Sequence, residues 1–119
     1  MSAAEGAEGL HIYLDGSVIS DMKSFYEEAD RKLTKDFVSG RNFAAFNDLL
    51  RGGFGLFRLG EPIVLHWTDF TNSSGKLGNK NRDILVDIIR KHNNVTFVPE
   101  DPETKEGHRR KRRENERKR

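Results

Sequence analysis

Three short apolar runs, separated by stretches of helical periodicity, restrict this chain to few folds. The runs cover residues 10–14, 63–67 and 95–98, and turn residues or prolines border them. Strands that alternate with helices pair in parallel, through right-handed crossovers. The sequence therefore predicts an α/β domain in which helices pack on a three-stranded parallel sheet. The first run shows little alternation of apolar and polar residues, so we expect both of its faces to be covered.

Apolar residues at helical spacing predict three helices between these runs. The helices cover residues 20–33, with Ser20 as the N-cap, residues 42–51, and residues 83–92. Residues 71–81 are rich in Asn, Ser, Gly and Lys, which predicts a loop with room for one short helical turn. The residues that we expect to be buried in the core are Phe43, Phe46, Leu50, Ile63, Leu65, Ile84 and Ile88.

The first helix carries a run of mixed charges, which predicts a side that faces solvent. Pairs at i,i+4 spacing join Glu27 to Arg31 and Glu28 to Lys32, and Asp30 belongs to the same run. The simplest interpretation is a solvated helix face.

The second helix has clear end signals and two different faces. Asn42 suits an N-cap, and Gly52 with Gly53 suits a left-handed helix exit. The inward face is apolar. Four residues form the outward face: Ala44, Asn47, Asp48 and Arg51. The pattern by itself fits either an ordinary solvated helix face or a binding site.

The glycine-rich residues 52–60 allow three interpretations. Arg51 with the next two glycines matches an RNA-binding RGG box, but such boxes act as repeats and only one copy is present. A phosphate-binding loop would precede a helix, whereas these glycines follow one. A helix stop followed by a partly packed loop fits the order of elements best.

Charge divides the chain into a domain and a basic tail. Residues 101–119 carry nine Lys or Arg against five Asp or Glu, whereas residues 1–100 carry twelve against fourteen. We expect a flexible segment at residues 1–9, a domain at residues 10–99 and a disordered tail at residues 100–119. The tail has no aromatic residue to stack on a base, so it predicts at most weak, sequence-independent nucleic-acid binding. The basic residues available for this are Arg109, Arg110, Lys111, Arg112 and Arg113.

Composition argues against several other classes of protein. The chain has no cysteine, which excludes thiol catalysis and Cys-ligated zinc. The histidines, His11, His66, His92 and His108, show no metal or triad spacing, so we predict neither an enzyme nor a metal or other cofactor. No apolar run approaches the ~18 residues of a membrane span, and we expect a cytoplasmic protein without membrane partners.

The element order, together with residues 40–50 (GRNFAAFNDLL) and residues 63–67 (IVLHW), resembles the barstar family. The resemblance covers about residues 10–98. It implies a barstar-like fold and an intracellular, monomeric inhibitor of a secreted ribonuclease such as barnase. Such an inhibitor covers the enzyme's active site with its second helix and the preceding loop. By this resemblance Asp48 is the central carboxylate, Gly40 and Asn42 are contacts at the helix start, and Gly52 is a backbone contact.

The same resemblance identifies departures from the family pattern. Ala44 and Asn47 stand where the family has an aspartate and a tryptophan, and Val38 or Ser39 stands where it has a tyrosine. Three arginines also depart from it. Arg41 replaces an acid, Arg51 replaces a threonine, and Arg82 lies near an expected glutamate. We therefore expect a less acidic face and weak electrostatic steering. The predicted partner-binding residues are Val38, Gly40, Asn42, Ala44, Asn47, Asp48, Arg51 and Gly52.

Two functions remain open from the sequence. The first is an immunity-type inhibitor of a secreted ribonuclease. The alternative is a nucleic-acid-associated protein that binds through the basic tail while its domain serves another protein partner.

Overall fold

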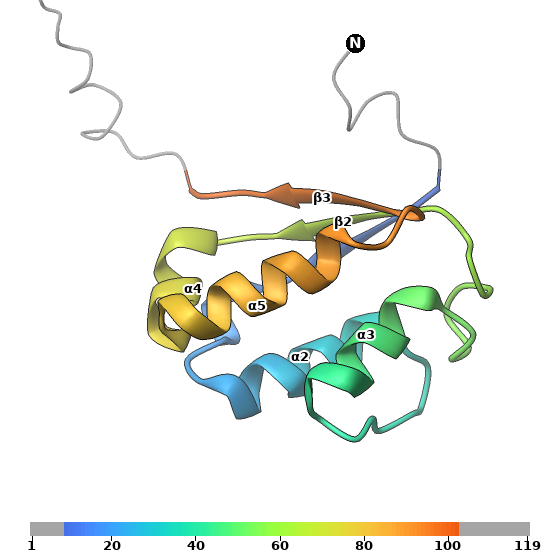
Figure 1. Cartoon of the computed structure of the whole chain (residues 1–119), viewed down its shortest axis with the longest axis horizontal. Helices are drawn as coiled ribbons and strands as arrows, with labels where there is room; N and C mark the ends of the chain where they lie inside the picture. Colours follow the sequence, from blue (N-terminus) through green and yellow to red (C-terminus); the bar gives the residue numbers. More distant parts are fainter. Residues whose placement is uncertain (1–8, 103–119) are drawn as a thin grey trace, which may run out of the picture.

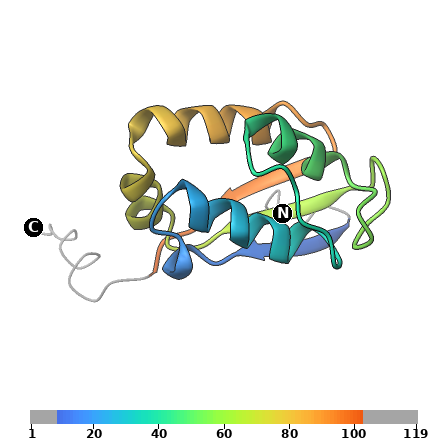
Figure 2. The same cartoon turned by 90° about the horizontal axis from the view of Figure 1, so that it is seen from below.

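The computed structural model describes residues 9–102 and consists of two layers, a sheet and a layer of helices on one of its faces (Figures 1 and 2). The sheet lies above the helices in Figure 1. The elements in chain order are β1 (Leu10–Leu14), the 3-10 turn η1 (Gly16–Val18), α2 (Met22–Leu33), α3 (Phe43–Arg51), β2 (Ile63–Trp67), α4 (Phe70–Leu77), α5 (Asn79–Arg90) and β3 (Val95–Pro99).

The sheet is parallel and has the order β1-β2-β3, as the sequence predicts. The central strand β2 is buried at all five positions. The prediction for β1 is wrong, because that strand is covered on one face only. Ile12 and Leu14 are buried under the helices, whereas His11 and Tyr13 are exposed on the other face. The reason is that β1 lies at the edge of the sheet and every described helix packs on the opposite side.

The core forms between the sheet and helices α2, α3 and α5. Phe46 of α3 packs edge-on against Phe25 at 5.1 Å between ring centroids, and Phe25 lies 5.2 Å from Trp67. Five of the seven expected core residues are buried: Phe46, Leu50, Ile63, Leu65 and Ile88. Phe43 and Ile84 are only partly buried, because they lie at the margin of this cluster.

The segment from Thr71 to Asn81 is helical, which corrects the predicted loop. It contains α4 apart from its first residue, Phe70, and the start of α5, and Gly78 with φ +90° separates the two helices. Contacts outside the segment hold its polar residues in place. Trp67 Nε1 donates to Ser73 Oγ at 2.8 Å, and the Thr71 amide and hydroxyl each donate to Asp101 at 2.7 Å. Tertiary hydrogen bonds thus override the low helix propensity of these residues.

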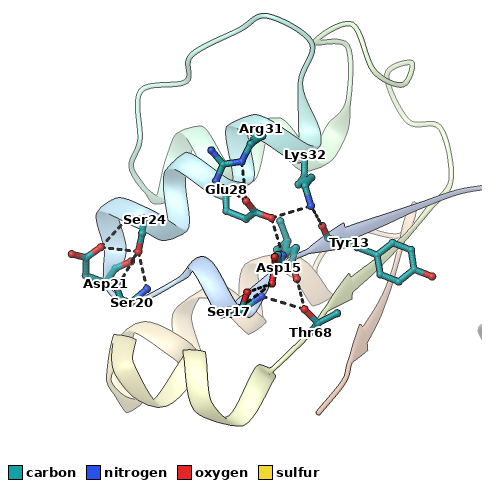
Figure 3. Close-up of polar contacts among 12 residues, drawn as sticks. Tyr13, Asp15, Ser17, Ser20, Asp21, Ser24, Glu28, Arg31, Lys32 and Thr68 are labelled. Carbon is teal, nitrogen blue, oxygen red and sulfur yellow. Dashed lines mark hydrogen bonds and ion pairs between the residues drawn. The ribbon is translucent and has the colours of Figure 1, made fainter. Parts of the chain in front are cut away.

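Helix α2 begins one residue later than predicted, with Asp21 as N-cap in place of Ser20. Asp21 and Ser24 form a capping box, in which the Ser24 amide donates to Asp21 Oδ1 at 2.8 Å. Figure 3 shows these bonds. They favour the charged carboxylate, so they lower the pKa of Asp21.

Glu28 of α2 is buried, which corrects the predicted solvated face. Its carboxylate accepts from the Asp15 amide at 2.8 Å, and it pairs with Arg31 at 2.7 Å and with Lys32 at 3.1 Å (Figure 3). Lys32 Nζ also donates to the Tyr13 carbonyl at 2.8 Å. The predicted pair of Glu28 with Lys32 is confirmed, whereas Arg31 pairs with Glu28 instead of Glu27. This network ties α2 to the end of β1.

The two residues that follow β3, Glu100 and Asp101, are hydrogen-bonded to the rest of the domain. The Glu100 amide donates to the Trp67 carbonyl at 2.9 Å, and Asp101 accepts the Thr71 bonds described above. Residues 100 and 101, which the sequence groups with the tail, therefore contact the domain. The expected flexible segment, apart from Gly9, and the basic residues from Arg109 to Arg113 lie outside the described residues. Within residues 9–102, no helix combines the length and apolarity needed to cross a bilayer.

Candidate partner-binding site

The outward face of α3 carries one exposed acidic side chain on a helix with fixed ends. Asn42 Oδ1 accepts from the Ala45 amide at 2.7 Å, which confirms the predicted N-cap. Ala44 and Asp48 are exposed. The Asp48 side chain is 57% exposed and lies 3.7 Å from Arg51 Nη1, itself 58% exposed. An exposed ion pair of this kind holds its members weakly, so Asp48 is free to exchange Arg51 for another cation.

Asn47 does not face solvent as predicted, because it packs against the end of α5. His92 Nε2 lies 2.8 Å from Asn47 Oδ1, and both residues are partly buried. The ring nitrogen donates in this contact because the amide oxygen only accepts. Burial lowers the pKa of His92, and the positive charges of Arg51 and Lys91 lower it further, whereas Asp48 opposes them. His92 is thus a site residue that the sequence does not reveal, because it lies 45 residues from Asn47.

The loop before α3, residues 34–42, is hydrogen-bonded to the Asp30 side chain of α2. Asp30 is only 6% exposed, which corrects its predicted place on a solvated face. Both of its carboxylate oxygens lie 3.2 Å from the Ser39 amide, and Arg41 Nε donates to Oδ2 at 3.1 Å. Arg41 is therefore paired with α2, and it is not a free positive charge on the α3 face.

The loop after α3, residues 52–62, folds back onto the helix. The Gly53 amide donates to the Phe57 carbonyl at 2.9 Å, and the Gly60 amide donates to the Arg51 carbonyl at 2.7 Å. The two loops also meet, since the Lys35 amide donates to the Phe54 carbonyl at 3.0 Å. These bonds confirm a helix stop followed by a packed loop.

A small cavity of about 150 Å³ opens beside Asp48 where the two loops meet. The rings of Phe37 and Phe54 pack in a tilted arrangement with their centroids 4.8 Å apart, and they form the apolar side of the cavity. Its lining residues are Phe37, Ser39, Gly40, Ala45, Asp48, Leu49 and Phe54. An apolar wall beside a single carboxylate suits one side chain that has an apolar stem and a cationic end.

The structure brings together most, but not all, of the predicted residues. Gly40 and Asp48 share the cavity, and Val38 beside it is 69% exposed. Gly52 is buried and ends the helix. As a glycine it can offer a partner only its backbone atoms. Arg82 is not part of the site, because it pairs with Asp83 at 2.9 Å and lines a different groove, with Phe97 of β3.

The histidines do not build a metal site in the described chain. His11 Nδ1 lies 2.9 Å from His66 Nε2, and His66 Nδ1 lies 3.0 Å from Glu100 Oε2. Within residues 9–102, no group of three or more potential ligands is arranged to hold a metal ion.

Comparison with known families identifies a match that covers most of the chain. The family model described as Barstar (barnase inhibitor) matches residues 10–108. No curated protein matches this chain.

Proposed function

The chain belongs to the barstar family, and we propose that it inhibits a ribonuclease by covering the enzyme's active site with α3 and the two loops beside it. The observation that carries the proposal is the position of Asp48. This carboxylate is exposed on a helix with a fixed N-cap, at the edge of an apolar cavity.

The chemistry of a ribonuclease cleft explains why such a carboxylate inhibits. The cleft holds substrate phosphate with cationic side chains, and a carboxylate makes charge-assisted hydrogen bonds to the same groups. Asn42 fixes the start of the helix that carries Asp48, so little conformational freedom is lost when the complex forms. Arg51 is the one cation paired with Asp48 among the described residues, and cations of the enzyme would replace it.

The partner and the setting are also part of the proposal. The partner is a secreted ribonuclease, which one copy of this chain blocks inside the producing cell, as an immunity protein acts. The cytoplasm is the compartment in which such an inhibitor protects cellular RNA.

An RNA-hydrolysis assay tests this function. Barnase and a panel of other secreted ribonucleases are assayed with wild type, with Asp48→Asn and with Asp83→Asn. Asp83 is the matched control, because its side chain is 69% exposed and lies on α5. We expect wild type and Asp83→Asn to inhibit at least one enzyme and Asp48→Asn to lose most of that inhibition. A wild-type protein that inhibits no member of the panel contradicts the proposal.

The basic tail supports a second candidate function, nucleic-acid binding. Residues 109–113 are all Lys or Arg, and such a run binds phosphate by releasing counterions. A form that lacks residues 103–119 separates the two functions. Under the inhibitor proposal this form inhibits as wild type does. Under the alternative it loses a nucleic-acid affinity that in the full chain falls as salt rises.

A further inference from the structure

Asp30 is a buried carboxylate whose hydrogen bonds all go to the loop before α3. Its side chain is 7% exposed, and it lies on α2, outside the proposed interface. A buried carboxylate is costly unless donors surround it. Here the donors are the Ser39 amide, at 3.2 Å from both oxygens, and Arg41 Nε at 3.1 Å. Because the buried Asp30 carboxylate is stable only with these donors around it, it holds both Ser39 and Arg41 in place.

The loop conformation at Arg41 depends on these bonds. Arg41 has φ +56°, a left-handed conformation that is unfavourable for a residue with a long side chain. The Arg41 amide donates to Ser39 Oγ at 3.2 Å, which closes a small ring of contacts with Asp30. Ser39 and Gly40 form one wall of the cavity at Asp48. Asp30 does not line the cavity, but it supports this wall through its bonds to Ser39 and Arg41.

Asp30 also determines where the charge of Arg41 lies. The Arg41 guanidinium is 3.1 Å from Asp30 and 3.8 Å from Glu27, both on α2, and its side chain is 37% exposed. Its positive charge is therefore compensated by two acids. Without Asp30, Arg41 would keep only the partly exposed pair with Glu27 at 3.8 Å. Its charge would then be free to move on the loop that forms the cavity wall, where it would repel a cationic partner.

We propose that Asp30 is a positioning residue for partner binding. It holds Ser39 and Arg41 so that the loop forms the cavity wall, and it keeps the Arg41 charge away from the nuclease. This inference rests on the proposed function. It also defines the partner further, as an enzyme that meets a neutral loop beside a single carboxylate.

Three variants separate the two effects of Asp30. Asp30→Asn keeps the size of the side chain but removes the charge. Asp83→Asn is the matched control, because Asp83 is an exposed carboxylate that pairs with Arg82 on α5, outside α3 and its two loops. The Asp30→Asn substitution leaves the positive charge of Arg41 without its main acidic partner. The double variant Asp30→Asn with Arg41→Gln removes that positive charge as well. Each variant is compared with wild type by its thermal unfolding midpoint, by NMR hydrogen exchange, and by the rate constants for the nuclease that wild type inhibits.

We expect Asp30→Asn to speed exchange at the Ser39 amide and the Arg41 Nε–H, by about tenfold or more. We also expect about tenfold slower association and faster dissociation of the nuclease complex. Adding Arg41→Gln should restore the association rate but not the dissociation rate. A purely structural role of Asp30 would not produce this rescue. Asp83→Asn should match wild type in every measurement.

Several results would overturn the inference. Equal rate constants for Asp30→Asn and Asp83→Asn would do so, as would an association rate that Arg41→Gln fails to restore. If wild type inhibits no nuclease, the proposed function fails. The exchange measurement then tests only whether Asp30 holds the loop in place. Unchanged exchange at Ser39 and Arg41 would refute that placement, and faster exchange in Asp30→Asn would support it.

Discussion

Two adjacent glycines after α3 differ in the space around them and in what their backbone conformation tolerates. Gly52 and Gly53 both have φ +92°, which is unfavourable for alanine. At Gly52 the ψ of −173° adds to this, because that combination of φ and ψ is essentially restricted to glycine. A Cβ at Gly52 would lie 2.4 Å from the Arg58 carbonyl oxygen and 2.8 Å from the Phe57 ring. A Cβ at Gly53 would have its nearest contact at 3.9 Å, with Leu59.

The expected costs follow from these distances. A positive φ costs about 1–2 kcal/mol for a residue with a Cβ at Gly53, and the region of φ and ψ at Gly52 costs about 1–3 kcal/mol. Forcing extra atoms into a packed site costs a further ~1–3 kcal/mol, and this applies to Gly52 alone. We therefore expect Gly53→Ala to lose about 1–2 kcal/mol and Gly52→Ala about 2–6 kcal/mol of unfolding free energy.

Equilibrium urea unfolding measures both values. The fluorescence of Trp67 is a suitable signal, because it is the only tryptophan in the chain and is fully buried. The slope of the transition should be the same in both variants, so that the midpoints compare directly. Equal losses for Gly52→Ala and Gly53→Ala would refute the packing of residues 52–60 against the end of α3.

Three further predictions concern the core, the end of α5 and pH. Phe46→Ala should lose about 3–5 kcal/mol in the same assay, because the ring is fully buried, and a loss below about 1 kcal/mol would contradict the facing of α3. Asn47→Ala should lose about 1 kcal/mol through its bond to His92, and no loss would show that this bond is not formed in solution. Because the pKa of His92 is lowered in the folded state, the unfolded chain binds the proton first as pH falls below about 6.5. Stability should therefore fall with pH in that range and fall less in His92→Gln, and urea transitions with equal pH dependence for the two proteins would contradict this.

The sheet and the facing of α3 could be predicted from sequence because they depend on local periodicity. The three apolar runs are the three strands, and Phe46 and Leu50 point inward at helical spacing. Asn42 could be identified as an N-cap because the capping bond is local, to an amide three residues away.

The remaining features could not be predicted because their partners are distant in sequence. Glu28 and Asp30 resemble a solvated charged face, yet both are buried against donors from other segments. The polar helix α4 depends on bonds to Trp67 and Asp101, and Asn47 depends on His92. Periodicity carries no information about such long-range polar contacts.

The most direct test of the inhibitor proposal is a calorimetric titration of a ribonuclease that the chain inhibits, with wild type and with Asp48→Ala. Removing one member of a desolvated charge pair strands the other, so we expect binding to weaken by at least about 2 kcal/mol, or roughly 30-fold. That magnitude is known for charged hot spots, those of the barnase–barstar complex among them. Folding should be unchanged, since the Asp48 side chain is 57% exposed. Equal affinity of Asp48→Ala and wild type, with binding abolished by deletion of residues 103–119, would contradict the proposal and assign the function to the basic tail.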